Sequence, residues 1–194
     1  MAAKQALPGK QYRHELKYVI SEGEHQLLSK RIHACLKQDY NASINGGEYF
    51  IRSLYFDDPF DTALWEKSSG VGSRDKFRIR IYDMKDDTIK LERKHKEGQY
   101  IKKDSVSLSR QDCDEIVRGK LECLKHNDSP FAMQFYGIFL ANHLRPKVLV
   151  DYTREPYVFP AEDVRITFDK NIRTAMRNTD LFNPDVITYP VWDL

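Results

Sequence analysis

Arginine and lysine recur at every second position in segments of this sequence that are rich in β-branched and aromatic residues. In the segment FRIRIY, Arg78 and Arg80 alternate with Phe77, Ile79 and Ile81. Side chains of a β-strand point alternately to the two faces of a sheet, so the spacing predicts one basic face and one apolar face. A guanidinium can donate two parallel hydrogen bonds to a phosphate, and a lysine adds a point charge. A basic strand face of this kind therefore suits a phosphorylated ligand.

Four further segments show the same alternation of charged and uncharged positions. Their predicted charged faces carry Arg13, Glu15 and Lys17; Glu92, Lys94 and Lys96; Tyr152 and Arg154; and Arg165, Thr167 and Asp169. Any one of them is equally typical of an antiparallel strand with its polar face in water. Taken together, their excess of basic residues favours a shared face. In a closed barrel that face would line a lumen, and because unpaired buried cations are costly, the lumen would need phosphates and a divalent metal held by the glutamates.

The elements that must position these residues alternate between strands and helices. Strands are expected at 11–20, 48–58, 75–84, 88–96, 99–109, 145–159, 164–170 and 172–178, with turns at Asp86-Asp87, Glu97-Gly98 and Lys170-Asn171. Helices are expected at 21–38, 60–69, 109–125 and 131–144. The first of these begins with a capping box formed by Ser21 and Glu24. Neighbouring strands adjacent in sequence predict an α+β fold, an antiparallel β-barrel tunnel with helices packed outside.

Composition excludes several classes of protein. The 194 residues include 31 Lys and Arg against 29 Asp and Glu, a net charge of +2, so this is no bulk polycation, and nucleic-acid binding is disfavoured. No stretch resembles a membrane span or a signal peptide. Cys35, Cys113 and Cys123 show no CxxC spacing, which favours a reducing, cytoplasmic location. Residues 1–11 are interpreted as an N-terminal arm or tag remnant, and 12–194 as one domain.

The order of six short motifs carries a family resemblance. RHELKY, SLYFDD, FRIRIY, LERK, DYTR and VRITFD, followed by TDLFNP, occur in the order found in the VTC domain. This is the polyphosphate polymerase domain of vacuolar transporter chaperone-like proteins, and it belongs to the triphosphate tunnel metalloenzyme superfamily. The sequence resembles that family from about Tyr12 to Asn183. The resemblance implies a basic tunnel that takes a nucleoside triphosphate and transfers its terminal phosphate to polyphosphate with Mn²⁺ or Mg²⁺.

The resemblance also implies roles for individual residues. Arg78, Arg80 and Lys94 would be catalytic. The phosphates would be bound by these three together with Lys17, Lys96, Lys103, Tyr152, Arg154 and Arg165. Lys102 is an alternative to Lys103, because the register of that strand is ambiguous by one residue. Glu15 and Glu92 are the candidate metal ligands.

One departure from the family pattern leaves the function open. The family continues past the TDLFNP loop into a strand with a metal-ligating glutamate in a Glu-x-Lys pattern, whereas this sequence ends at Leu194, so we expect a domain lacking its last strands. Three functions follow as alternatives. They are a polyphosphate polymerase-like transferase, a triphosphate hydrolase of the same fold, and a non-catalytic module that binds polyphosphate, pyrophosphate or inositol polyphosphates.

Overall fold

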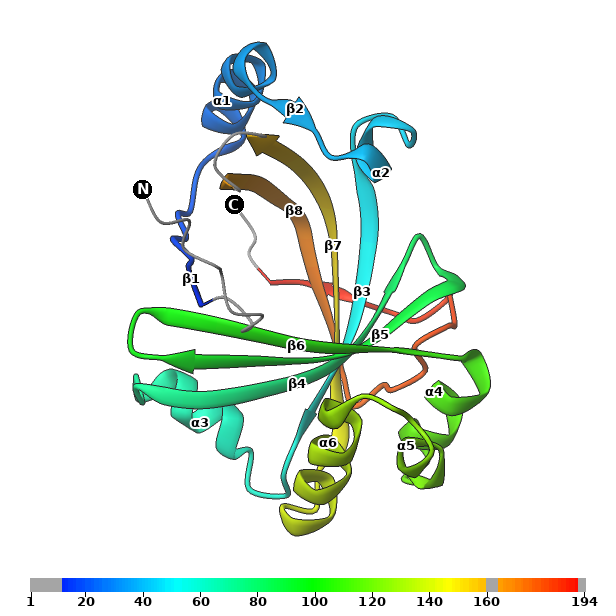
Figure 1. The fold of residues 1–194 in the computed structure, drawn as a ribbon. Helices are drawn as coiled ribbons and strands as arrows, with labels where there is room; N and C mark the ends of the chain where they lie inside the picture. Colours follow the sequence, from blue (N-terminus) through cyan, green and yellow to red (C-terminus); the bar gives the residue numbers. More distant parts are fainter. Residues whose placement is uncertain (1–11, 160–163, 192–194) are drawn as a thin grey trace, which may run out of the picture.

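The computed structural model describes residues 12–159 and 164–191, and one large antiparallel sheet organises them (Figure 1). The predicted N-terminal arm lies outside the described residues. The strand order is β1-β6-β5-β4-β3-β7-β8-β9, with β2 paired to β7. The strands are β1 (Arg13–His14), β2 (Lys37–Gln38), β3 (Tyr49–Asp57), β4 (Ser73–Tyr82), β5 (Lys85–Glu97), β6 (Tyr100–Leu108), β7 (Arg145–Phe159), β8 (Val164–Met176) and β9 (Tyr189–Pro190).

Six helices accompany the sheet. They are α1 (Glu22–Cys35), α2 (Tyr40–Ser43), α3 (Thr62–Ser68), α4 (Arg110–Val117), α5 (Glu122–Lys125) and α6 (Pro130–Ala141). Both hydrogen bonds of the predicted capping box at Ser21 and Glu24 are present at the start of α1. Figure 1 shows α4, α5 and α6 grouped at one end of the molecule and α1 at the other.

The hydrophobic core lies between the sheet and α4–α6. From the sheet it takes the apolar residues predicted from the alternation, including Phe77, Ile79 and Ile81, and from α6 it takes Phe131 and Phe135. The ring of Phe135 packs on that of Phe77 with centroids 5.4 Å apart. We call this face of the sheet the outer face and the opposite one the inner face. Alternation along β4 therefore places Arg78 and Arg80 on the inner face.

Several predicted boundaries are wrong. Only Arg13 and His14 of the segment 11–20 form a strand, because only these two residues pair with β6. The chain turns between β4 and β5 at Asp83 and Met84, both with positive φ, rather than at Asp86-Asp87, which lie inside β5. The helix expected at 109–125 is two helices, and Gly119 with φ +81° lies between them.

The segments 164–170 and 172–178 form one strand, β8, rather than two. Asn171 has a φ of +53°, and the pairing of β8 with β7 shifts register at this point, between Asp151 and Thr153. An extra residue in one strand of a pair is a β-bulge, which bends the strand without ending it. The turn predicted at Lys170-Asn171 is therefore this bulge, inside one continuous strand.

The predicted closure of the barrel is not found among the described residues. β1 and β9 lie at the two ends of the strand order and pair only with β6 and β8, respectively. Figure 1 shows the group β4–β6 crossing the group β3, β7 and β8, so that the sheet is strongly coiled. The fold is thus α+β, with a large antiparallel sheet and helices α4–α6 packed on its outer face.

A basic inner face as the candidate functional site

Arg78 lies at the middle of the inner face, directly opposite Glu92 on β5 and Tyr55 on β3. Its Nε donates to Glu92 Oε2 at 2.8 Å, and its Nη2 lies 2.7 Å from the same oxygen. Its Nη1 donates to the hydroxyl of Tyr55 at 3.0 Å. Burial disfavours the charged guanidinium, but Tyr55 and Glu92 outweigh it and raise the pKa of Arg78 above its ordinary value, so the residue is a permanent cation.

Arg80 lies one alternation further along β4 and is almost fully buried, with 4% of its surface exposed. Its Nη2 donates to the hydroxyl of Tyr152 on β7 at 2.8 Å, and its Nε donates to Ser53 Oγ at 3.4 Å. Its Nη1 is 3.9 Å from Glu92 Oε2. Arg80 therefore links the middle strands of the sheet to β7.

Glu92 is a buried carboxylate among three cations. Only 1% of it is exposed, and it contacts Arg78, Arg80 and the Nζ of Lys103 on β6. Burial by itself raises the pKa of Glu92. The two arginines and Lys103 have the larger, opposite effect and lower this pKa overall, from 4.5 to about 2. The contact also resolves the register of β6, because Lys103 faces inward whereas Lys102 lies opposite His95 on the outer face. Glu92 is ionised at neutral pH and neutralises part of the basic face.

Glu15 is the second acidic centre. It follows β1 and accepts two hydrogen bonds from Lys94 Nζ, at 2.7 and 2.8 Å. Lys17 and Arg13 lie 3.5 and 3.8 Å from its carboxylate. Burial raises the pKa of Glu15, but Lys94, Lys17 and Arg13 lower it overall. Since β1 is so short, this carboxylate is the main link between the N-terminal segment and the inner face.

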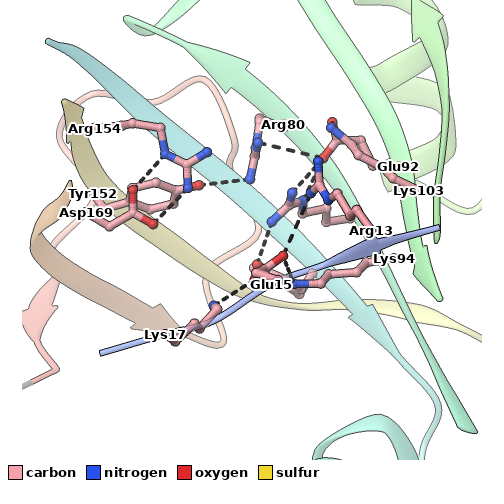
Figure 2. A network of polar contacts seen from close by, with 12 residues as sticks. Arg13, Glu15, Lys17, Arg80, Glu92, Lys94, Lys103, Tyr152, Arg154 and Asp169 are labelled. Atoms are coloured by element: carbon pink, nitrogen blue, oxygen red, sulfur yellow. Dashed lines mark hydrogen bonds and ion pairs between the residues drawn. The ribbon is translucent and has the colours of Figure 1, made fainter. Parts of the chain in front are cut away.

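A third pair extends the network onto β7 and β8. Arg154 donates to both oxygens of Asp169, from Nε at 2.7 Å and from Nη2 at 2.8 Å. Its guanidinium lies 5.2 Å from the ring centroid of Tyr152. Tyr152 thus lies between Arg80 and Arg154. Figure 2 shows the contacts of Arg80 with Tyr152 and Glu92 beside those of Arg154 with Asp169, and the separate group around Glu15 next to them on the inner face.

Most of the residues predicted from the sequence lie together in this network. Its members are Glu15, Arg78, Arg80, Glu92, Lys94, Lys103, Tyr152 and Arg154. Lys17 contacts Glu15 from an exposed position. Lys96 lies opposite Arg74 and Ile101, with no ion pair within residues 12–159 and 164–191. Arg165 lies apart from the network, half-exposed, with its Nη2 3.7 Å from Asp39.

Tyr55 and Lys76 are among the inner-face residues that the sequence analysis does not name. Tyr55 contacts Arg78, and Lys76 lies one alternation before it on β4, opposite Lys94. The period-two pattern could have found both, since Lys76 precedes Arg78 by two residues and Tyr55 follows Ser53 by two.

The described carboxylates do not fit a resident divalent metal. Across the described ranges, no three residues of the types His, Cys, Asp and Glu gather into a group that would hold one. Glu15 and Glu92, the predicted ligands, each contact two or more cations. Cations at this distance compete with a metal for the carboxylate oxygens. The metal role of these glutamates stays a prediction.

The architecture defines a class of fold: a coiled antiparallel sheet with helices packed on its outer face. Two solved structures are similar to this chain in fold. One is a putative adenylate cyclase from Bacillus halodurans, with a TM-score of 0.52 and 14% sequence identity. The match covers 81% of this chain and 70% of the cyclase chain. The other is a putative adenylyl cyclase from Hippeastrum described as having a dominant triphosphatase activity. It has a TM-score of 0.52 and 16% identity, and the match covers 80% of this chain and 69% of its own.

Within this class the chain belongs to the VTC domain family, whose model matches residues 12–192. Comparison with curated proteins gives no match. No helix in the described part of the chain is both long enough and apolar enough to cross a membrane.

Proposed function

We propose that the inner face binds the phosphates of a nucleoside triphosphate and of a polyphosphate chain, and that it promotes transfer of the terminal phosphoryl group from one to the other. The observation that supports this most is the imbalance of charge in the network. Five cations, Arg78, Arg80, Lys94, Lys103 and Arg154, share three carboxylates, those of Glu15, Glu92 and Asp169. Membership of the VTC family supports the same class of ligand.

The residues act by positioning and by neutralising charge. In the transfer, the bond between the γ-phosphorus and the β–γ bridging oxygen breaks, and a terminal oxygen of the acceptor chain forms the new bond. The nucleoside diphosphate leaves with the electron pair. Phosphoryl transfer needs no nucleophile from the protein, and fixed cations stabilise the charge on the transferred group and on the leaving oxygen. Arg78 and Arg80 have the least exposed side chains of these five cations, 17% and 5%, so we assign them to the reacting phosphates.

A second candidate is hydrolysis, with water in place of the polyphosphate acceptor. The reported triphosphatase activity of the Hippeastrum protein supports it. The same inner face would serve either reaction, because the two differ only in the acceptor.

Incubation with ATP and MnCl₂ or MgCl₂ separates the candidates. Transfer predicts long-chain polyphosphate on a gel, whereas hydrolysis predicts free phosphate alone. Arg80→Gln is expected to weaken binding of inorganic tripolyphosphate about 10- to 100-fold, because a charge-assisted hydrogen bond contributes about 1.5–3 kcal/mol. Arg118→Gln, at an exposed position after α4, is the matched control. Equal binding by wild type and Arg80→Gln would contradict the proposal.

A further inference from the structure

Arg78 is held by Glu92 on one side and by Tyr55 on the other, and some of its N–H donors have no partner among the described residues. A guanidinium has five N–H donors. Within the described residues, Nε and Nη2 each make a contact with Glu92, and Nη1 donates to Tyr55. Two N–H groups therefore have no protein acceptor, and the side chain keeps 17% of its surface exposed. Two parallel N–H groups are the arrangement with which arginine binds a phosphate.

Tyr55 and Glu92 hold this guanidinium in different ways. The glutamate brings a negative charge, which offsets the charge of Arg78. The hydroxyl oxygen of Tyr55 instead accepts from Nη1, on the opposite side from Glu92, and so fixes the direction of that donor. Tyr55 and Arg78 are directly opposite each other on paired strands, and the guanidinium carbon of Arg78 lies 5.8 Å from the centroid of the Tyr55 ring. The position of the phenol is thus set by the sheet itself.

We infer that Tyr55 is a positioning residue, which orients Arg78 so that its two free N–H groups face the bound phosphate. This inference rests on the proposed function of the inner face and adds a residue to it. Without the hydroxyl, only Glu92 would direct the guanidinium, and the side chain would turn toward that carboxylate at the expense of the ligand.

The ionisation of Tyr55 agrees with this geometry. Burial raises the pKa of a phenol, but Arg78, followed by Arg80 and Lys76, lowers the pKa of Tyr55 overall. The phenolic oxygen therefore lies in a strongly positive environment, where it accepts from Arg78.

Calorimetric titration with inorganic tripolyphosphate, at fixed salt and without metal, tests the inference. Tyr55→Phe is expected to weaken binding about three- to tenfold, the effect of one hydrogen bond. In an Arg78→Ala background the same change is expected to have less than about a 1.5-fold effect, because the hydroxyl acts through that arginine. Tyr82→Phe, which removes a hydroxyl from a ring packed against Tyr49, is the matched control. If Arg78→Ala fails to fold, Arg78→Lys replaces it.

The outcomes are distinguishable. A wild-type protein that does not bind tripolyphosphate overturns the proposed function and this inference with it. Wild-type binding that Tyr55→Phe leaves unchanged overturns the inference alone, even if the variant is less stable to urea. An equal loss in both backgrounds also overturns it, because the phenol would then act independently of Arg78.

Discussion

Ionisation of the buried carboxylate of Glu92 links the stability of the protein to pH. Its folded pKa is about 2, against an ordinary value of 4.5, so its ionised form stabilises the native state above pH 4.5. This stabilisation is lost as the pH falls toward 2. We expect the difference in unfolding free energy between wild type and Glu92→Gln to narrow by about 2 kcal/mol between pH 6 and pH 3.

Urea denaturation at a series of pH values measures this difference. Glu97→Gln, an exposed change at the end of the same strand, is the control. A difference that stays constant with pH would mean that Glu92 does not titrate between these limits, and the ion-pair assignment would fail.

Which residues share a face could be predicted from the sequence, but their partners could not. Alternation placed Arg78, Arg80 and Arg154 together because a strand has a fixed period. It placed Arg165 with them as well, yet Arg165 lies near one end of β8 and contacts Asp39 instead. Contacts of this kind depend on how elements distant in sequence approach one another, which periodicity does not encode.

At the scale of the element, β4 and β5 place like charges opposite each other. Arg74 lies opposite Lys96, and Lys76 lies opposite Lys94. Burial lowers the pKa of Lys76, and Lys67, Arg74 and Lys94 lower it further. Lys76 has no ion pair within the described ranges. Opposed like charges destabilise a strand pair, so Lys76→Gln is expected to raise the unfolding free energy by about 0.5 kcal/mol.

Urea denaturation at low ionic strength detects this gain, which added salt is expected to reduce. Lys85→Gln, at the exposed start of β5, is the control. A loss of stability in Lys76→Gln would show that the lysine contributes more by packing than it costs by repulsion. A gain would show that this end of the inner face is strained in the absence of an anion.

The strands and helices themselves could largely be predicted, because long periodic segments are strongly specified. The errors occur where the backbone leaves regular geometry. The turn at Asp83-Met84 contains no glycine or proline that would mark it in the sequence. The alternation at 11–20 predicts a long strand, but only Arg13 and His14 pair with a neighbouring strand. Propensity describes a segment by itself, whereas a strand exists only where a neighbour pairs with it.

For the molecule as a whole, Arg52 on β3 forms a buried ion pair with Asp151 on β7 and also holds the segment after β8. Arg52 Nε and Nη2 each donate to Asp151 at 2.8 Å, and Nη1 donates to the carbonyl of Asn183 at 2.5 Å. Arg52 and Asp151 are 3% and 4% exposed. Arg52→Met would leave the aspartate buried without its partner, so we expect the unfolding free energy to fall by about 3–5 kcal/mol.

The double variant Arg52→Met/Asp151→Leu provides the comparison, again by urea denaturation. It is expected to recover most of the loss, because a buried ion pair replaced by apolar residues is often close to neutral. A double variant as unstable as the single one would mean that the contact with Asn183, rather than the ion pair, carries the stabilisation.

The bulge at Asn171 has a consequence for how β8 can change in length. Before it, Asp169 faces inward, and after it, Arg173 and Ala175 face outward, with Ala175 opposite Leu149 in the core. Deleting Asn171 would leave a regular strand in which all three residues keep their present facing. If β8 kept its present length but had no bulge, Arg173 and Ala175 would point to the inner face instead. The middle of β8 is therefore a place where the chain can lose one residue while Ala175 stays on the core side of the sheet.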